Sequence, residues 1–253
     1  MRYIVWFFML LVISHHANAI DFGGLLNEET LKSLKGSAAS SPARTPVGTN
    51  LSDGDVVNGL KEALSQGSAA AVAKLGKPDG FLGNDRVKIP LPESLQKTEG
   101  LLRTLGQGKV VDDLITTMNR AAEAAVLEAK MLLLDAVKKM SVQDAKNILN
   151  GGDSAATSYF RKTTEVQLHN KFLPVVTKTT NKFALAEKYN QYAGQASKVG
   201  LMDEKQASVQ EYVTTKALDG LFLMMADEEK AIRQNPMERT GYWVKKVFGS
   251  SGL

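Results

Sequence analysis

Apolar residues recur every three to four positions along most of this chain, the spacing that gathers side chains on one face of an α-helix. The clearest early case follows Ser52, a favourable N-cap whose first turn carries Asp53 and Asp55. The stripe ends at 76–80, G-K-P-D-G, where glycine and proline favour a turn. The pattern therefore predicts a helix over 52–75 and a change of chain direction directly after it.

The same spacing predicts a longer helix over 108–140. Because residues 131–134 are apolar on all sides, we expect this half of the helix to be central and buried. Other helices are expected over 92–105, 142–149, 154–172, 174–199 and 203–234, with a last one that carries Tyr242, Trp243, Val247 and Phe248.

Individual residues set the expected ends of these helices. Ser141 and Asp144 have the spacing of a capping box, which restarts the chain as a short helix. Asp153 follows a Gly-Gly turn and is expected to cap the next helix. Pro174 fits the first turn of a helix better than its interior, so we expect it to open a new helix, and a break or kink near Asn181 stays open.

One apolar stretch, 81–91, does not follow the helical spacing. Its Val87, Ile89 and Leu91 alternate with charged or proline residues, which is the period of an extended chain or short strand. Prolines within and after the stretch limit its pairing. No internal repeat or sustained heptad is present. The predicted fold class is therefore all-α, a multi-helix orthogonal or bundle-like domain with at most one short extended segment, about 81–91.

The N-terminus has a different composition. Arg2 precedes an apolar run over 3–13, and Ala17-Asn18-Ala19 places small residues at both positions that signal peptidase inspects. The run is shorter than the roughly 20 apolar residues of a membrane span. We expect a signal peptide over 1–19, cleaved after Ala19, and hence a periplasmic protein.

Behind this leader, 20–50 is expected to form a short helix and a flexible linker rich in small polar residues. A single helical domain is expected over 51–249, with no transmembrane span in the mature chain. The chain contains no Cys, so its stability must come from core burial. Its formal charge is +4, with Lys and Glu interspersed, whereas nucleic-acid binders concentrate basic side chains. No nucleic-acid partner is expected; a small molecule or an envelope protein stays open as partner.

Motifs for metal or cofactor chemistry are scarce. Of the three histidines, His15 and His16 lie in the leader, which leaves His169. One histidine excludes multi-His zinc sites and the H-E-x-x-H motif, and no G-x-S-x-G sequence surrounds a serine. We expect no metal and no cofactor, favour a binding protein over an enzyme, and expect His169 near the surface.

A set of polar residues in apolar helical surroundings is the strongest site candidate. Asn119, Arg120 and Glu123 fall within one turn among alanines and leucines. Similar surroundings are found at Asp135, Lys216 and Asp219. Buried charges are costly unless paired, so we expect these groups to pair across neighbouring helices 108–140 and 203–234. They would form a salt-bridge network that fixes helix register, or a polar ligand pocket. An acid–base site is a third interpretation, with Glu123 or Asp135 acting beside Arg120 or Lys216.

Four separated segments, 75–91, 105–123, 149–161 and 216–233, carry a family resemblance. Through them the chain resembles the bacterial domain-of-unknown-function family 4197, whose members look like exported helical envelope proteins of Gram-negative bacteria without an assigned reaction. The resemblance points to eight residues as candidate binding positions without giving their roles: Asn119, Arg120, Glu123, Asp153, Tyr159, Arg161, Lys216 and Asp219. Some relatives look like lipoproteins, but this chain lacks the cysteine required for that tether.

Three classes of function follow. The leading hypothesis is a periplasmic helical binding or interaction protein that uses the polar cluster or the extended segment 81–91. A rival is an enzyme with an unfamiliar helical active site. The third is a peripheral lipid-handling protein with an apolar stripe along 242–248.

Overall fold

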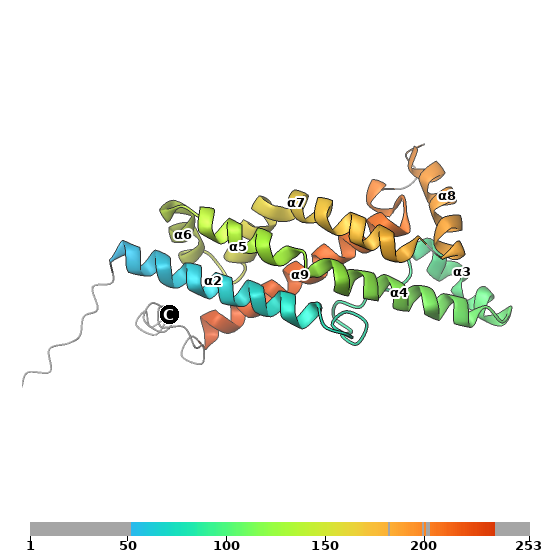
Figure 1. Cartoon of the computed structure of the whole chain (residues 1–253), viewed down its shortest axis with the longest axis horizontal. Helices are drawn as coiled ribbons and strands as arrows, with labels where there is room; N and C mark the ends of the chain where they lie inside the picture. Colours follow the sequence, from blue (N-terminus) through green and yellow to red (C-terminus); the bar gives the residue numbers. More distant parts are fainter. Residues whose placement is uncertain (1–51, 182, 199, 201–202, 236–253) are drawn as a thin grey trace, which may run out of the picture. The chain divides into compact units, whose positions relative to one another are not determined.

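A computed structural model of the chain describes residues 52–181, 183–198, 200 and 203–235. Throughout these residues the fold is all-α and contains no strand, as predicted (Figure 1). The expected leader, the segment 20–50 and the last helix at 242–248 lie outside the described residues. The elements are α2 (Asp53–Leu75), α3 (Glu93–Thr104), α4 (Gly108–Val126), α5 (Ala129–Lys139), α6 (Val142–Leu149), α7 (Ala155–Thr180), α8 (Ala184–Lys198), η1 (Glu204–Gln206) and α9 (Val209–Gln234).

Local capping explains where several helices begin. The Ser52 hydroxyl accepts a hydrogen bond from the Asp55 amide at the start of α2, and Ser208 does the same for Glu211 at the start of α9. At α6, Ser141 forms the expected capping box with its third helical residue. Each cap satisfies one of the backbone donors that a helix N-terminus leaves unpaired. The caps predicted at 52 and 141 are confirmed.

α9 is the central element of the core. It packs against α2, α4 and α7, and α4 also packs against α7. The core between these helices is apolar, and Leu114, Met118 and Ala121 of α4 are fully buried in it. The predicted contact between the helical regions 108–140 and 203–234 is therefore confirmed for α4 and α9.

The single helix expected over 108–140 is wrong. The regular helical hydrogen bonding is interrupted after Val126, where the Glu128 amide donates to the Ala125 carbonyl three residues back before α5 begins. α5 packs against α2 and α7, whereas α4 packs against α9 and α7. Met131 is 62% exposed, so residues 131–134 are not buried on all sides as expected.

The helix start expected at Pro174 is also wrong. Pro174 lies inside α7, which continues to Thr180, and the break comes at Asn181. An interior proline costs about 3 kcal/mol, but Phe172 and Val176 on either side are fully buried. Pro174 itself is exposed. Burial of the flanking apolar side chains offsets the cost of the proline.

The start of α7 is capped by a distant helix and not by Asp153. Asp153 is exposed in the turn before the helix, and the N-cap Ser154 makes no side-chain cap hydrogen bond. Instead Glu229 of α9 accepts hydrogen bonds from the amides of Ala156 and Thr157, both at 2.9 Å. A carboxylate from another helix thus satisfies the first donors of α7, and the cap predicted at Asp153 is wrong.

Gly220 of α9 lies against the extended segment. A Cβ at Gly220 would come within 2.7 Å of Phe81 Cε1 and 3.3 Å of Val87 Cβ. Because Phe81 is fully buried, its ring cannot move away freely. Only a residue without a side chain allows this close approach.

We therefore expect Gly220→Ala to lower the free energy of unfolding by about 1–2 kcal/mol, because overpacking outweighs the gain in helix propensity. The control is Gly100→Ala in α3, where a Cβ would meet nothing within 4 Å. That variant should gain about 0.5–1 kcal/mol. Urea denaturation measures both changes, and stabilisation by both substitutions would contradict the close packing.

Candidate functional site

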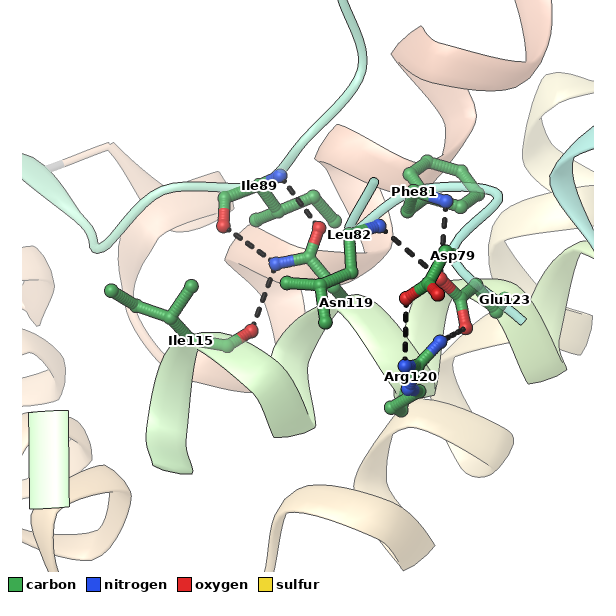
Figure 2. A network of polar contacts seen from close by, with 8 residues as sticks. All are labelled: Asp79, Phe81, Leu82, Ile89, Ile115, Asn119, Arg120 and Glu123. Carbon is green, nitrogen blue, oxygen red and sulfur yellow. Dashed lines mark hydrogen bonds and ion pairs between the residues drawn. The ribbon is translucent and has the colours of Figure 1, made fainter. Parts of the chain in front are cut away.

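The segment between α2 and α3, residues 76–92, is a non-helical loop fastened to α4; we call it the clamped loop. Asn119 of α4 makes the central attachment. Its Oδ1 accepts from the Ile89 amide at 2.8 Å, and its Nδ2 donates to the Ile89 carbonyl at 2.9 Å (Figure 2). The same Nδ2 donates to the Ile115 carbonyl at 2.8 Å. A single buried amide therefore satisfies both backbone groups of Ile89.

Glu123, one turn further along α4, makes the second attachment. Its Oε1 accepts hydrogen bonds from the amides of Phe81 at 3.1 Å and Leu82 at 3.2 Å. Its Oε2 accepts from Arg120 at 2.7 Å. The Glu123 side chain is only 6% exposed, so its charge is stabilised by these donors in place of water.

Arg120 links Glu123 to the first turn of the clamped loop. Its second terminal nitrogen donates to Asp79 at 2.8 Å (Figure 2). The hydrogen bonds with Glu123 and then with Asp79 raise the pKa of the Arg120 guanidinium. Asp79 has a φ of 63°, a left-handed conformation that Asp tolerates better than most residues. The ion pair therefore holds an unusual turn in place.

The far end of the clamped loop is attached to α9. The Tyr212 hydroxyl donates to the Leu91 carbonyl at 3.4 Å, and burial raises the pKa of Tyr212 to about 12. Near the middle of the loop, Arg86 forms a two-bond ion pair with Asp227 of α9. The clamped loop is thus fixed on both sides, by α4 and by α9.

Because Asn119 and Glu123 hold the clamped loop, their polar atoms have little capacity left to bind a ligand or transfer a proton. Both Glu123 oxygens and both polar atoms of the Asn119 side chain are already bonded within the protein. Asp135 pairs instead with Lys138 on α5 at 3.6 Å. In the described part of the chain, no hydrogen bond or ion pair joins Asp135 or Lys216 to the Arg120–Glu123 pair. The expected pairing of these groups across α4 and α9 is therefore wrong.

Three other predicted residues gather on the outer face of α7 and α9. Arg161 donates to Asp219 at 3.3 Å, and its guanidinium carbon lies 4.5 Å from the centroid of the Phe222 ring. Lys216 is exposed, with its ammonium 5.9 Å from the centroid of the Tyr212 ring. Aromatic faces attract cations at these distances. The structure thus brings Arg161, Asp219 and Lys216 to one face, apart from the buried clamp.

The remaining predicted residues have other positions. Tyr159 of α7 donates to the Ala136 carbonyl at 3.2 Å, which attaches α7 to α5, and burial raises the pKa of its phenol. Asp153 is exposed before α7. His169 is partly exposed and lies 2.8 Å from Glu211, a boundary position as expected.

Two clefts flank the clamped loop. The first, the α4-side cleft, has a volume of about 580 Å³. Its apolar lining comes from Leu82, Pro90 and Ile115, and its polar lining from Asp85, Lys88, Arg103, Asp112 and Thr116. Arg103 donates to Asp112 at 2.7 Å and thereby lowers the pKa of that carboxyl.

The second, the α9-side cleft, has a volume of about 190 Å³ and lies between the clamped loop and α9. It is lined by Arg86, Val87, Lys88, Pro90, Lys216, Asp219, Gly220 and Leu223. Lys88 and Pro90 line both clefts, so they form the ridge between them. The alternation predicted for 81–91 is found over 87–91, where Val87, Ile89 and Leu91 are buried and Lys88 and Pro90 are exposed. The extended chain is shorter than expected, because residues 81–87 form hydrogen-bonded turns.

Among the described residues, no group of three or more His, Asp or Glu side chains is arranged to hold a metal ion. Over the same part of the chain, no helix combines the length and apolar character required to cross a membrane.

Several structurally important residues were missed by sequence reasoning. Glu229 and Arg233 form a nearly buried pair in α9, with Arg233 also donating to the Ile148 carbonyl at 2.8 Å. Glu229 and Arg233 are four residues apart within an apolar helical stripe, and this spacing could have predicted their ion pair. Asp79 and Asp227 had no such signal, because their partners are distant in sequence.

Comparisons with known proteins place the chain in an uncharacterised group. A family model described as a protein of unknown function (DUF4197) matches residues 50–249. No curated protein and no solved structure matches the chain.

Proposed function

The chain belongs to the DUF4197 family of proteins of unknown function, and we propose that it is an exported binding protein of the bacterial cell envelope. In this proposal the clamped loop forms the recognition surface, and the α4-side cleft takes a small zwitterionic or peptide-like ligand. The buried Asn119–Glu123 turn positions this surface and does not contact the ligand.

The main support is the rigid placement of the clamped loop beside an open cleft. Ligand sites are commonly concave, with volumes of about 300–1,000 Å³, and largely preformed; the α4-side cleft has about 580 Å³. The loop's attachment at Ile89, Phe81 and Leu82 reduces the ordering that binding would otherwise require.

The lining of the α4-side cleft supports the proposed ligand class. Asp85 and Lys88 supply opposite charges on the rim, and Ile115 supplies apolar surface. A short peptide carries an amine, a carboxylate and apolar side chains that match these groups. Cell-wall peptides are ligands of this kind that an exported protein would meet.

Binding is favoured over catalysis because Glu123, the buried carboxylate that holds the clamped loop, has both oxygens bonded within the protein. A general acid or base must reach the proton that it transfers, but both Glu123 oxygens point at donors within the protein. Export is supported by the sequence, through Arg2, the apolar run over 3–13 and the Ala17-Asn18-Ala19 pattern.

The test begins with the full chain expressed in a Gram-negative host. We expect the protein in the periplasmic fraction, with an intact mass that corresponds to a start at Ile20. This material is then screened by thermal shift against muropeptides from digested cell wall and against synthetic tripeptides. A saturating ligand should raise the melting temperature by about 5 °C.

The matched variants are Thr116→Trp, which fills the α4-side cleft, and Thr98→Trp on exposed α3 outside the cleft lining. Only Thr116→Trp should abolish the shift. Finding the protein in the cytoplasmic fraction with the mass of the full, uncleaved chain would contradict export. The binding proposal fails if no peptide stabilises the protein, or if both tryptophan variants respond equally.

A further inference from the structure

The α9-side cleft concentrates positive charge on the opposite side of the clamped loop. Three of its lining residues are cations, Arg86, Lys88 and Lys216, and one is a carboxylate, Asp219. The lining therefore has a formal charge of +2. The α4-side cleft differs, because its lining has equal numbers of cations and carboxylates.

The carboxylates near this cleft are already bonded to arginines. Asp219 accepts from Arg161 of α7, and Asp227 accepts from both terminal nitrogens of Arg86. Glu165 also bonds Arg161 but does not line the cleft. Among the described residues, no acidic side chain pairs with either lysine of the cleft, so two positive charges remain available to a ligand.

Both lysines are attached to firmly held backbone. Lys88 lies between Val87 and Ile89, which are both buried, and the Asn119 clamp fixes Ile89. Lys216 belongs to α9, and its ammonium lies over the ring of Tyr212. Because these positions are set before a ligand arrives, binding costs less ordering of the protein.

We propose that the α9-side cleft binds a phosphate group through Lys88 and Lys216. This inference rests on the proposed binding role of the clamped loop and names a second ligand chemistry for it. A guanidinium fork matches carboxylate and phosphate alike, but the Arg86 fork is already occupied by Asp227. The two free ammonium groups act as point charges, so they favour the anion with the larger charge, and a phosphate monoester carries about −1.5 to −2 at neutral pH.

The size and exposure of the cleft agree with this chemistry. Its volume of about 190 Å³ accommodates a phosphate group with a short substituent, and is below the roughly 300 Å³ at which drug-sized ligand sites begin. A free phosphate, a soluble phosphate monoester and the headgroup of an anionic phospholipid present the same chemistry. The experiment must therefore separate soluble from lipid sources.

The test titrates the purified protein with inorganic phosphate and glycerol phosphate at constant ionic strength, followed by backbone amide NMR shifts. Saturable shifts should centre on residues 86–89 and 216–220. We expect Lys88→Ala and Lys216→Ala each to weaken binding about tenfold. The control is the double variant Lys130→Ala/Lys139→Ala, which removes two positive charges from exposed positions on α5, one more than either cleft variant removes, and should bind normally.

A second arm measures flotation with vesicles of phosphatidylcholine alone and with added phosphatidylglycerol. Lysine-dependent binding to the anionic vesicles, without binding to soluble phosphates, would identify a lipid headgroup as the source; the reverse would identify a soluble phosphate. The proposal is overturned if neither arm shows binding, or if the control variant loses as much as the cleft variants. Thr116→Trp separates this result from the proposed function, because it should abolish peptide binding and leave phosphate binding unchanged.

Discussion

Replacing Asn119 by alanine is expected to lower the free energy of unfolding by about 3 kcal/mol. The Asn119 side chain is fully buried and makes three hydrogen bonds, two of them to Ile89. Its removal leaves the amide and the carbonyl of Ile89 without hydrogen-bond partners. Each buried polar group left without a partner costs about 1–3 kcal/mol. Urea denaturation measures the loss.

Hydrogen exchange should locate this effect in the clamped loop. In Asn119→Ala the Ile89 amide should exchange faster than other amides of the core, because its acceptor has been removed. The control is Thr116→Ala, an exposed position one turn earlier on α4, which should change stability by less than about 0.5 kcal/mol. An Asn119→Ala protein with unchanged stability and an equally protected Ile89 would contradict the role assigned to this side chain.

Replacing Glu229 by alanine is expected to cost about 3–5 kcal/mol of stability. The side chain is 6% exposed and satisfies the amides of Ala156 and Thr157 as well as the Arg233 guanidinium. Its loss removes the N-terminal cap of α7 and leaves a nearly buried arginine without its counter-ion. Breaking one side of a buried ion pair is more destabilising than losing an exposed pair.

A double-mutant cycle separates the cap from the ion pair. Arg233→Ala removes the cation and leaves the cap of α7, and the double variant removes both. Because the uncompensated charge is absent in the double variant, its loss should be smaller than the sum of the two single losses by at least 1 kcal/mol. Strict additivity in urea denaturation would show that Glu229 and Arg233 act independently.

Local features of the chain predicted most helices but not all of their ends. The helix starts at Ser52 and Ser141 depend on a side chain and an amide three residues away, which a sequence pattern contains. The interruption after Val126 and the continuous helix through Pro174 occur where these helices pack against others. Intrinsic preferences do not include the energy of that packing, so these two predictions failed.

For the candidate site, the sequence predicted which residues are buried but not which groups they bond. Polar residues inside an apolar stripe correctly predicted a buried cluster at Asn119 and Glu123. Its partners were mispredicted as side chains of another helix, whereas most are backbone groups of the clamped loop, at sequence separations of 30 for Ile89 and 42 for Phe81. Backbone amides are present at every residue, so they leave no trace in composition or spacing.

The Asn119 amide has a further consequence for the behaviour of the protein at high concentration. An apolar extended segment with open backbone groups is a template for intermolecular β-pairing and aggregation. At Ile89, the centre of the alternating strip, both of these groups are bonded to Asn119 within the same molecule. The Asn119 side chain thereby takes the hydrogen-bonding positions that a neighbouring strand would use, and neither backbone group of Ile89 is open to pairing with a second copy of the protein.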